Sequence, residues 1–223
     1  MKSDLIDPDT KYASAADPAL GHIPNDLIAA IQNVYKPAGM QLTDQALREA
    51  ESAEYGASRF GLDGHSIVFR VAKTTPTKIG QFVTIWKRPT SGSTIAPLDV
   101  DDGVAFVVVS VFDATHRGQF VFDQKILVSK GIMAINGKGG KRAIRVYPPW
   151  VKPVAKEAVR TQQWQLRYFL PLEQSASADP VQVRRLFEVQ DPYPSLPAKE
   201  QSYPQELQHP GSEKTGGRAS SVG

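Results

Sequence analysis

A short loop with three glycines and three cationic side chains has a residue pattern typical of anion binding in this 223-residue chain. Residues 136–142 read NGKGGKR. Glycines let backbone N–H groups turn toward an anion, and Lys138, Lys141 and Arg142 place positive charge around that concavity. The loop is not a Walker A motif, because Arg142 stands where that motif needs Ser or Thr. The pattern predicts a phosphate site without triphosphatase activity; a solvated loop between a helix and a strand is the alternative.

A second cationic stretch, residues 66–88, organises the other candidates. Its two runs of β-branched and aromatic residues, 67–71 and 81–86, flank Pro76, which predicts an antiparallel hairpin with Lys73 and Lys78 at its tip. We expect these cations to contact phosphates while nearby aromatic rings stack on unpaired bases. The predicted binding residues are Arg70, Lys73, Lys78, Lys87, Arg88, Lys138, Lys141, Arg142, Arg145, Tyr147 and Trp164. For the aromatic residues, burial in the core is the alternative.

The charge of the chain is distributed unevenly. Residues 66–168 hold 16 Lys and Arg against 6 Asp and Glu, a balance of +10. Of the 26 basic and 23 acidic residues in the whole chain, the two ends keep 10 and 17, a balance of −7. A basic centre with acidic flanks predicts a face that binds a polyanion such as nucleic acid, and a solvated surface with a chance excess of lysine is the alternative.

Two polar clusters have both a binding and a structural interpretation. Asp99, Asp101 and Asp102 could converge on divalent metal ions, but their position in a loop favours a solvated turn. The segment 162–165 reads QQWQ, and its amides could bind base edges or cap backbone groups.

Composition excludes several classes of protein. The chain has no cysteine, which excludes disulfides, thiolate metal sites and cysteine nucleophiles. Its four histidines lack the HxxxH and HExxH spacings of metal sites, so we predict no metal and no cofactor. No apolar run approaches the roughly 18 residues of a membrane-spanning helix, so we expect a cytoplasmic protein with no membrane partner.

Hydrophobic periodicity and turn residues predict an α+β fold, in which helices flank a mainly antiparallel sheet of five or six strands. The expected helices are 25–35, 45–53, 124–129 after an Asp123 cap, 153–168 and 181–189. The expected strands are 55–62, 66–73, 79–88, 104–112, 119–122 and 143–147. We place the domain at residues 22–172, and expect disorder in the polar extension 1–21 and in most of the Pro-, Ser-, Gln- and Gly-rich tail 173–223.

Three long segments resemble the MepB family in order and in sequence. They are EYGASRFGLDGHSIVFRVAKTTPTKIGQFVTIWKR (54–88), KGIMAINGKGGKRAIRVYPPW (130–150) and TQQWQLRYF (161–169). The resemblance covers roughly residues 44–170. It implies a bacterial protein with a fold distantly similar to PD-(D/E)XK nucleases, and with nucleic acid as the partner.

The nuclease resemblance also implies catalytic candidates. Gln81 and Lys87 fall on one face of the expected strand, and Glu54 could approach from the preceding segment. However, Ile85-Trp86-Lys87 stands where that pattern needs (D/E)-x-K, so the required carboxylate is absent. Mg²⁺ or Mn²⁺ is therefore expected only if the chain is a nuclease. Binding of nucleic acid or another phosphate-bearing polyanion is the leading hypothesis, ahead of a metal-dependent phosphodiesterase and of a small-ligand or protein-interaction module.

Overall fold

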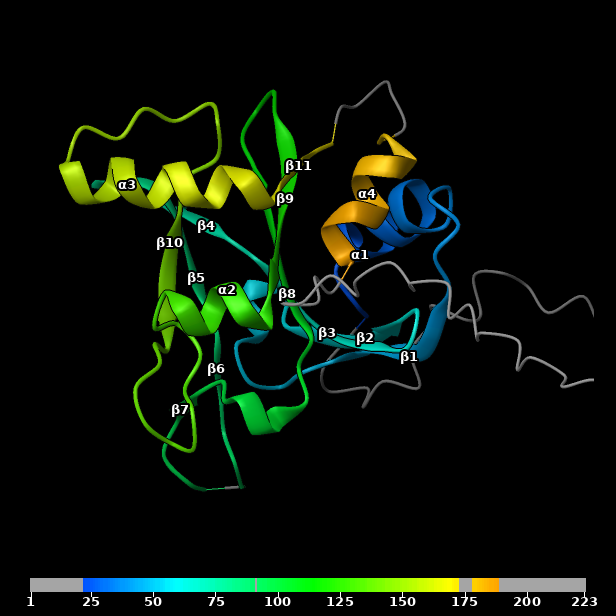
Figure 1. Ribbon diagram of the computed structural model, residues 1–223, viewed down its shortest axis with the longest axis horizontal. Helices are drawn as coiled ribbons and strands as arrows, with labels where there is room; N and C mark the ends of the chain where they lie inside the picture. The colour runs from blue at the N-terminus through cyan, green and yellow to red at the C-terminus, as the bar shows by residue number, and fades with distance from the viewer. Residues whose placement is uncertain (1–21, 91, 173–177, 189–223) are drawn as a thin grey trace, which may run out of the picture. The chain divides into compact units, whose positions relative to one another are not determined.

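The computed structural model describes residues 22–90, 92–172 and 178–188, and a six-stranded sheet lies at its centre (Figure 1). In spatial order its strands are β1 (Leu42–Arg48), β2 (Ser58–Leu62), β3 (His65–Val71), β8 (Phe106–Phe112), β9 (Arg117–Asp123) and β11 (Phe169–Pro171). Within this sheet β3 and β8 run parallel, and the other neighbouring pairs are antiparallel. The α+β class is confirmed, with a mixed sheet.

The central strand β8 confirms the interpretation of the apolar run at 104–112. Its residues from Phe106 to Val109 are 0% exposed, because β3 and β9 pair with its two edges and both faces are covered. Val108 faces one hydrophobic core, whereas Val107 and Val109 face another. A strand buried on both faces has no polar alternation, which is why this run is continuous.

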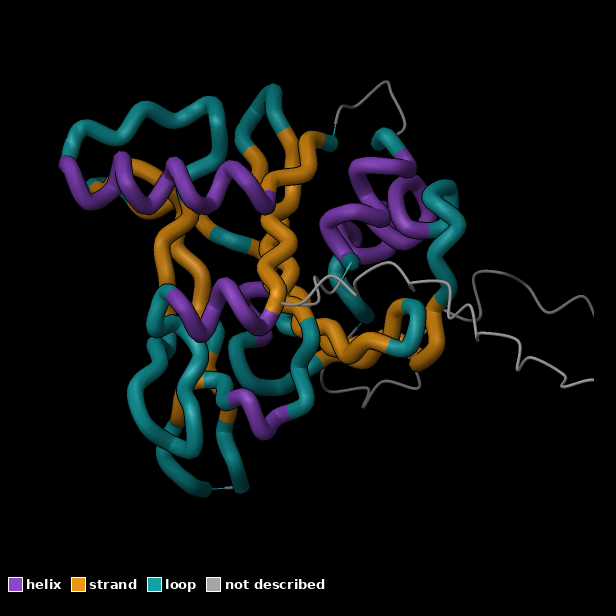
Figure 2. Tube along the Cα trace, viewed as in Figure 1, coloured by secondary structure: helices purple, strands orange, loops and turns teal. Residues whose placement is uncertain are grey.

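A second, three-stranded sheet has the order β10 (Ala143–Val146), β5 (Lys78–Thr84) and β4 (Lys73–Thr75). It stands apart from the main sheet, beside the helices α2 and α3 (Figures 1 and 2). The short strands β6 (Trp86–Lys87) and β7 (Ala96–Pro97) form a separate antiparallel pair.

The predicted hairpin between residues 66–73 and 79–88 is wrong for the strand 66–71, which does not pair with 79–88. Both edges of β3 are already occupied, by β2 and by β8, so β3 cannot pair with β5. The chain instead crosses between sheets at Ala72, and only β4 pairs with β5. Lys73 lies opposite Phe82, and its ammonium sits 4.9 Å from the centre of the Tyr55 ring. The two lysines therefore do not project together from one tip.

The predicted helix 45–53 is also wrong. Residues Leu42–Arg48 form β1, an edge strand that pairs with β2 through an irregular register. Ala46 is buried in that strand, and the exposed polar residues around it have little intrinsic preference for helix over strand. Pairing with β2 outweighs the weak helical periodicity, as tertiary context commonly does. The following strand begins at Ser58 rather than Tyr55, because Ala53–Tyr55 forms the 3-10 turn η3.

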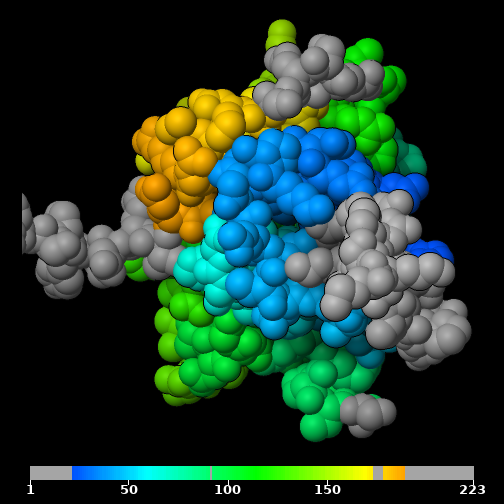
Figure 3. All heavy atoms as spheres, turned by 90° about the vertical axis from the view of Figure 1, so that its right-hand side faces the viewer, coloured from blue at the N-terminus to red at the C-terminus, as the bar shows by residue number. Residues whose placement is uncertain are grey.

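Three helical elements cover one face of the main sheet. They are α1 (Asn25–Ala30), the π-helical turn η2 (Ile31–Tyr35) and α4 (Pro180–Phe187). Figure 3 shows α4 in orange directly beside the blue α1 and η2. Val183 and Phe187 of α4 are buried in this first core, so the folded part continues past the boundary expected at residue 172. The residue before α1 is Pro24, and neither Asn25 nor Asp26 caps it.

The opposite face packs on α2 (Gln124–Ser129), α3 (Lys156–Gln165) and the second sheet, around a second core that includes Phe122, Leu127 and Val146. The predicted Asp123 cap is confirmed, since its Oδ1 accepts from the Ile126 N–H at 2.7 Å. α3 starts three residues later than expected and continues into the 3-10 turn η5 (Leu166–Tyr168). In the described ranges no helix has the length and apolar character needed to cross a membrane. The extensions 1–21 and 189–223 and the segment 173–177, on which the disorder predictions fall, lie outside the described residues.

Candidate anion-binding face

Several predicted phosphate contacts gather in one pocket of about 440 Å³, the charge-lined pocket. Its wall contains the cations Arg59, Arg70, Lys87 and Arg88, the acids Glu49, Glu51 and Asp102, and also Ala50, Trp86 and Pro89. Strand β3 supplies Arg70, and the chain around β6 supplies Lys87 and Arg88. Cations and carboxylates thus reach this pocket in nearly equal number.

Arg70 is the most unusual residue of the pocket, because its side chain is a buried charge. The residue is 1% exposed, and Nη1 donates to Glu49 Oε2 at 2.6 Å and to the Phe69 carbonyl at 2.9 Å. Burial lowers the pKa of Arg70, and the neighbouring carboxylate of Glu49 opposes this effect. A guanidinium buried in this way holds the Glu49 carboxylate in place. Its burial also keeps it out of reach of a nucleic-acid phosphate.

The other cations of the charge-lined pocket are also paired. Lys87 contacts the Asp102 carboxylate, and Arg88 donates to Glu51 Oε1 at 2.6 Å and to the Ser93 carbonyl. Arg59 shares Glu49 with Arg70, at 2.9 Å. A phosphate would have to displace a carboxylate at each of these positions. The cations of this pocket therefore form ion pairs within the chain and are poorly available to a phosphate.

The glycine loop holds an anion that belongs to the chain itself. The backbone N–H of Gly137 donates to Asp99 Oδ2 at 2.7 Å, and Asp101 N–H donates to Oδ1 at 3.2 Å. Asp99 also caps the 3-10 turn η4 (Val100–Asp102), with Asp102 completing the capping box. The Gly137 hydrogen bond is the first cause of a lowered pKa at Asp99. The aspartate cluster is therefore a structural turn, while Lys138, Lys141 and Arg142 remain exposed around the loop.

We expect Asp99→Asn to lower the urea midpoint at pH 7. A carboxyl whose pKa is lowered by folding stabilises the native state above its unfolded pKa of about 3.9, and this contribution is lost as pH falls through the folded-state pKa. The difference between wild type and Asp99→Asn should therefore shrink below about pH 4. Asp101→Asn, an exposed neighbour, is the control. A gap of constant size from pH 7 to pH 3 would contradict this role.

The three catalytic candidates do not come together. Glu54 is exposed on η3, Gln81 lies in a different pocket near the start of β5, and Lys87 pairs with Asp102 in the charge-lined pocket. Across the described ranges no three His, Asp or Glu side chains are grouped so as to hold a metal ion. The residues present do not fit the Mg²⁺ or Mn²⁺ site that a nuclease needs, so they support no metal-dependent step.

Arg145 and Tyr147 have structural contacts. The Arg145 guanidinium donates to the Gly80 carbonyl and to Thr75 Oγ1, both at 3.0 Å, and so clasps the β4–β5 turn. Gly80 has φ +81°, and a Cβ there would lie 2.7 Å from the Tyr147 ring. Glycine is needed at this position because φ is positive where the register of β4 and β5 shifts, and because the tyrosine packs closely on it.

The amide-rich segment of α3 caps backbone groups at two of its three glutamines. Gln162 Nε2 donates to the carbonyls of Pro148 and Val151, at 3.1 and 2.8 Å. Gln165 is 1% exposed; its Oε1 accepts from Tyr147 N–H at 2.9 Å and its Nε2 donates to the Arg145 carbonyl at 3.0 Å. These amides fasten α3 to β10 and to the segment that follows it.

Replacing Gln165 with leucine should destabilise the fold, since the Tyr147 N–H and the Arg145 carbonyl would lose their buried partner. The expected cost is roughly 1–3 kcal/mol for each group left unpaired. Gln163→Leu is the matched control, because Gln163 is exposed on the same helix. Urea denaturation of both variants checks this, and equal midpoints would show that Gln165 does not fasten α3.

A second pocket, of about 450 Å³, runs between α3 and the end of α2, and we name it the basic groove. Its cations are Lys130, Arg160 and Arg167; Trp164 lies among them, and the other lining residues are Glu157, Thr161 and Gln163. Lys130 Nζ lies 5.7 Å from the Trp164 ring, whose inner side packs on Phe122. The sequence pattern indicated Trp164 but not its cationic neighbours. Arg160 and Arg167 could have been found, because they stand four and three residues from Trp164 on one helix face.

The basic groove lies next to the glycine loop. The backbone N–H of Lys141 donates to the Ile132 carbonyl at 2.8 Å, two residues beyond Lys130. The loop therefore ends beside the C-terminal end of α2, and its Lys138, Lys141 and Arg142 are exposed. We call the groove and these three residues together the basic face.

Comparisons with known proteins agree with one another. The MepB-like family model matches residues 49–171, more than half of the chain. A solved structure described as "Crystal Structure of MepB" is similar at 31% sequence identity and a TM-score of 0.56, over 68% of this chain and 99% of that one. No protein with curated function matches significantly. The matched range contains the charge-lined pocket, the glycine loop and the basic groove. The chain belongs to the MepB-like family.

Proposed function

We propose that this MepB-like chain binds a phosphate-bearing polyanion, with nucleic acid as the polymer, through the basic face. The observation that carries the proposal is the basic groove, in which Lys130, Arg160 and Arg167 surround Trp164 while Glu157 is the one acidic residue of the wall. A cytoplasmic location is part of the proposal, because nucleic acid is present there.

The cations of the groove are free to meet phosphates. The Arg160–Glu157 pair has a separation of 4.0 Å, and its side chains are 72% and 93% exposed. Such an exposed pair contributes little and gives way readily to a competing anion. In the charge-lined pocket, by contrast, Arg70, Lys87 and Arg88 already face carboxylates. Geometry therefore favours the groove over the residues of the 66–88 stretch.

Trp164 adds a second kind of contact. Its ring is half-buried, so part of its surface stays available beside the cations. Aromatic rings set among Lys and Arg stack on unpaired bases of single strands, which adds affinity with little sequence preference. This combination favours single-stranded over double-stranded nucleic acid.

The experiment is the binding of fluorescently labelled 20-nucleotide single strands and 20-base-pair duplexes, followed by anisotropy from 50 to 300 mM salt. If all six cations of the basic face meet phosphates, log K should fall against log salt with a slope of about −4 for single strands. Polyphosphate and heparin of similar charge are the competitors that separate nucleic-acid binding from general polyanion binding. A slope near zero would reject the proposal.

The phosphodiesterase alternative is tested in the same samples. The chain is incubated with the labelled strands and Mg²⁺ or Mn²⁺, and the proposal expects the strands to remain intact. Cleavage that disappears in Lys87→Ala would instead place a catalytic site in the charge-lined pocket.

A further inference from the structure

Three side chains of the basic groove form a row along α3 and η5. Arg160, Trp164 and Arg167 all line the groove, and they follow one another at intervals of four and three residues, so they share one side of the helix. An α-helix rises about 1.5 Å per residue, which places the Cα atoms of Arg160 and Arg167 about 10 Å apart, with Trp164 between them. The groove therefore offers a cation, an aromatic ring and a second cation in sequence.

The two arginines of this row are suited to hold two different phosphates. Both are exposed; Arg167 makes no ion pair with a described residue, and the contact of Arg160 with Glu157 is long and exposed. A guanidinium can donate two parallel hydrogen bonds to one phosphate, and such charged bonds are stronger than neutral ones. Because the backbone positions of the arginines are about two helical turns apart, each arginine can hold a phosphate of its own.

The row is bounded at both ends. Glu157 lines the groove three residues before Arg160, and its side chain is 93% exposed. A phosphate placed beyond Arg160 would meet this negative charge and be repelled. At the other end Arg167 is the last residue that lines the groove, and β11 begins at Phe169. The row therefore fits a short part of a strand, with one phosphate at each of its arginines.

Trp164 supplies the place for the base between these phosphates. The inner side of its ring packs on Phe122, with ring centroids 5.3 Å apart, while the residue also lines the groove. In the free protein Lys130 Nζ lies over this ring, 5.7 Å from its centre. A stacked base contributes more than an exposed cation–π contact, so a base displaces the ammonium from the ring. The displaced Lys130 remains in the groove as a third cation.

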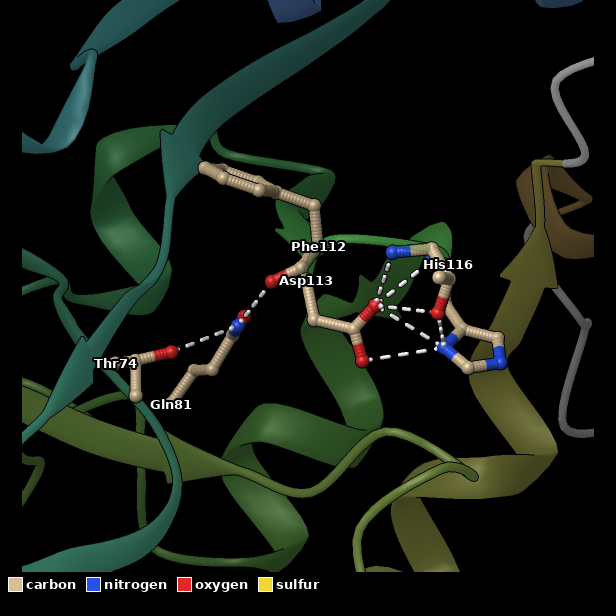
Figure 4. Close-up of polar contacts among 6 residues, drawn as sticks. Thr74, Gln81, Phe112, Asp113 and His116 are labelled. Atoms are coloured by element: carbon tan, nitrogen blue, oxygen red, sulfur yellow. Dashed lines mark hydrogen bonds and ion pairs between the residues drawn. The ribbon is translucent and has the colours of Figure 1, made fainter.

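Trp150 is less suited to this role, because a carboxylate borders the same pocket. Its ring stacks on His116 with centroids 5.1 Å apart, and both carboxylate oxygens of Asp113 lie 3.1 Å from His116 Nδ1 (Figure 4). The backbone N–H groups of Thr115 and His116 donate to Asp113 and lower its pKa to about 2, so the carboxylate is charged at neutral pH. Asp113 and Trp150 line one pocket, and this charge repels the phosphates that flank a stacked base.

We propose that the basic groove binds one nucleotide of a strand together with the phosphates on both of its sides: the base stacks on Trp164, one phosphate meets Arg160 and the other meets Arg167. This inference rests on the proposed function and adds the unit of the strand that the groove recognises. Stacking accepts every base, because each has a π-face. A nucleoside 3′,5′-bisphosphate contains the whole unit, whereas a monophosphate lacks one of its phosphates.

The test titrates the full chain with adenosine 3′,5′-bisphosphate, with the adenosine 3′- and 5′-monophosphates, and with ribose 3,5-bisphosphate, which lacks the base. Binding is followed at low salt through the backbone amide signals of α3 in ¹⁵N–¹H spectra. Adenosine 3′,5′-bisphosphate should bind about tenfold more tightly than either monophosphate, the usual value of one more charged hydrogen bond. It should also bind more tightly than ribose 3,5-bisphosphate, because only the nucleotide can stack on Trp164.

Three variants link these differences to the row of side chains. Arg160→Gln and Arg167→Gln should each remove the advantage of the bisphosphate over the monophosphates, since each variant loses one phosphate contact. Trp164→Leu should keep that advantage but bind the adenosine and ribose bisphosphates equally. Lys156→Gln is the control, because Lys156 is exposed on α3 but does not line the groove, and it should keep both differences.

Equal affinities of the bisphosphate and the monophosphates would overturn this proposal, and so would an advantage that survives in both arginine variants. The labelled 20-nucleotide strand separates this failure from that of the proposed function. If the strand binds with the expected salt dependence while the bisphosphate has no advantage, only the recognition of this unit is wrong. If neither the strand nor any nucleotide binds, both proposals are wrong.

Discussion

Replacing Glu49 with alanine is expected to destabilise the protein by roughly 3–5 kcal/mol, more than the loss of any other carboxylate in the charge-lined pocket. Arg70 is 1% exposed, and the Glu49 carboxylate at 2.6 Å is the group that compensates its charge. Without it, the buried guanidinium keeps only the Phe69 carbonyl as a partner among the described residues. The urea-unfolding free energy at pH 7 measures this cost.

Two substitutions distinguish a buried uncompensated charge from the simple loss of a contact. Arg70→Met removes the charge itself and keeps much of the side-chain volume, so it should cost clearly less than Glu49→Ala. Glu51→Ala breaks the Arg88 pair in the same pocket, where the two side chains are 31% and 39% exposed, and should cost under about 1 kcal/mol. If Glu49→Ala lowered the free energy of unfolding no more than Glu51→Ala does, the buried charge of Arg70 would not need Glu49 as its partner.

Reversing two charges in the basic groove is expected to have the largest effect on binding. Arg160→Glu with Arg167→Glu should lower affinity for a single strand at least tenfold at low salt, and should flatten the slope of log K against log salt by about 0.7 for each residue. Both arginines line the groove and are exposed, Arg160 on α3 and Arg167 on η5. The loss should be the same for different base sequences, because phosphates carry no sequence information.

The control for this experiment lies on the other face of the main sheet. Arg185 is exposed on α4, which packs on the first core, whereas α3 borders the second. Arg185→Glu changes net charge as much as either single groove variant, so it reports the effect of charge alone. If Arg185→Glu and Arg160→Glu weakened binding equally, the polymer would be held by net charge and not by the groove.

Local signals predicted the parts of the fold that depend on neighbours in sequence. Asp123 caps α2 as expected, and the apolar run at 104–112 contains the central strand β8. The errors came from pairing. Nothing near residue 45 indicates that β2 will offer an edge there, and nothing in 66–73 indicates that β8 will occupy the edge that a hairpin would need. Such partners are distant in sequence, and the choice between them is made by the whole sheet.

Only some of the residues that line the candidate site could be predicted from the sequence. Residue types indicated anion binding, and Trp164, one of the residues they indicated, lines the basic groove. The sequence could not reveal that Asp99 would occupy the glycine loop, or that Arg70 would be buried against Glu49, because both partners come from distant segments. Lys130 was missed for the same reason: it joins Trp164 only when the end of α2 packs beside α3.

The three tryptophans of the chain provide the most direct measurement, because Trp86 lines the charge-lined pocket, Trp150 lines a third pocket beside β5, and Trp164 lines the basic groove. Each gives its own indole N–H signal in a ¹⁵N–¹H spectrum, to be assigned by single Trp→Phe variants. During titration with a single-stranded oligonucleotide, the Trp164 signal should shift saturably while the Trp86 signal stays in place. A shift of Trp86 without one of Trp164 would contradict binding through the basic groove.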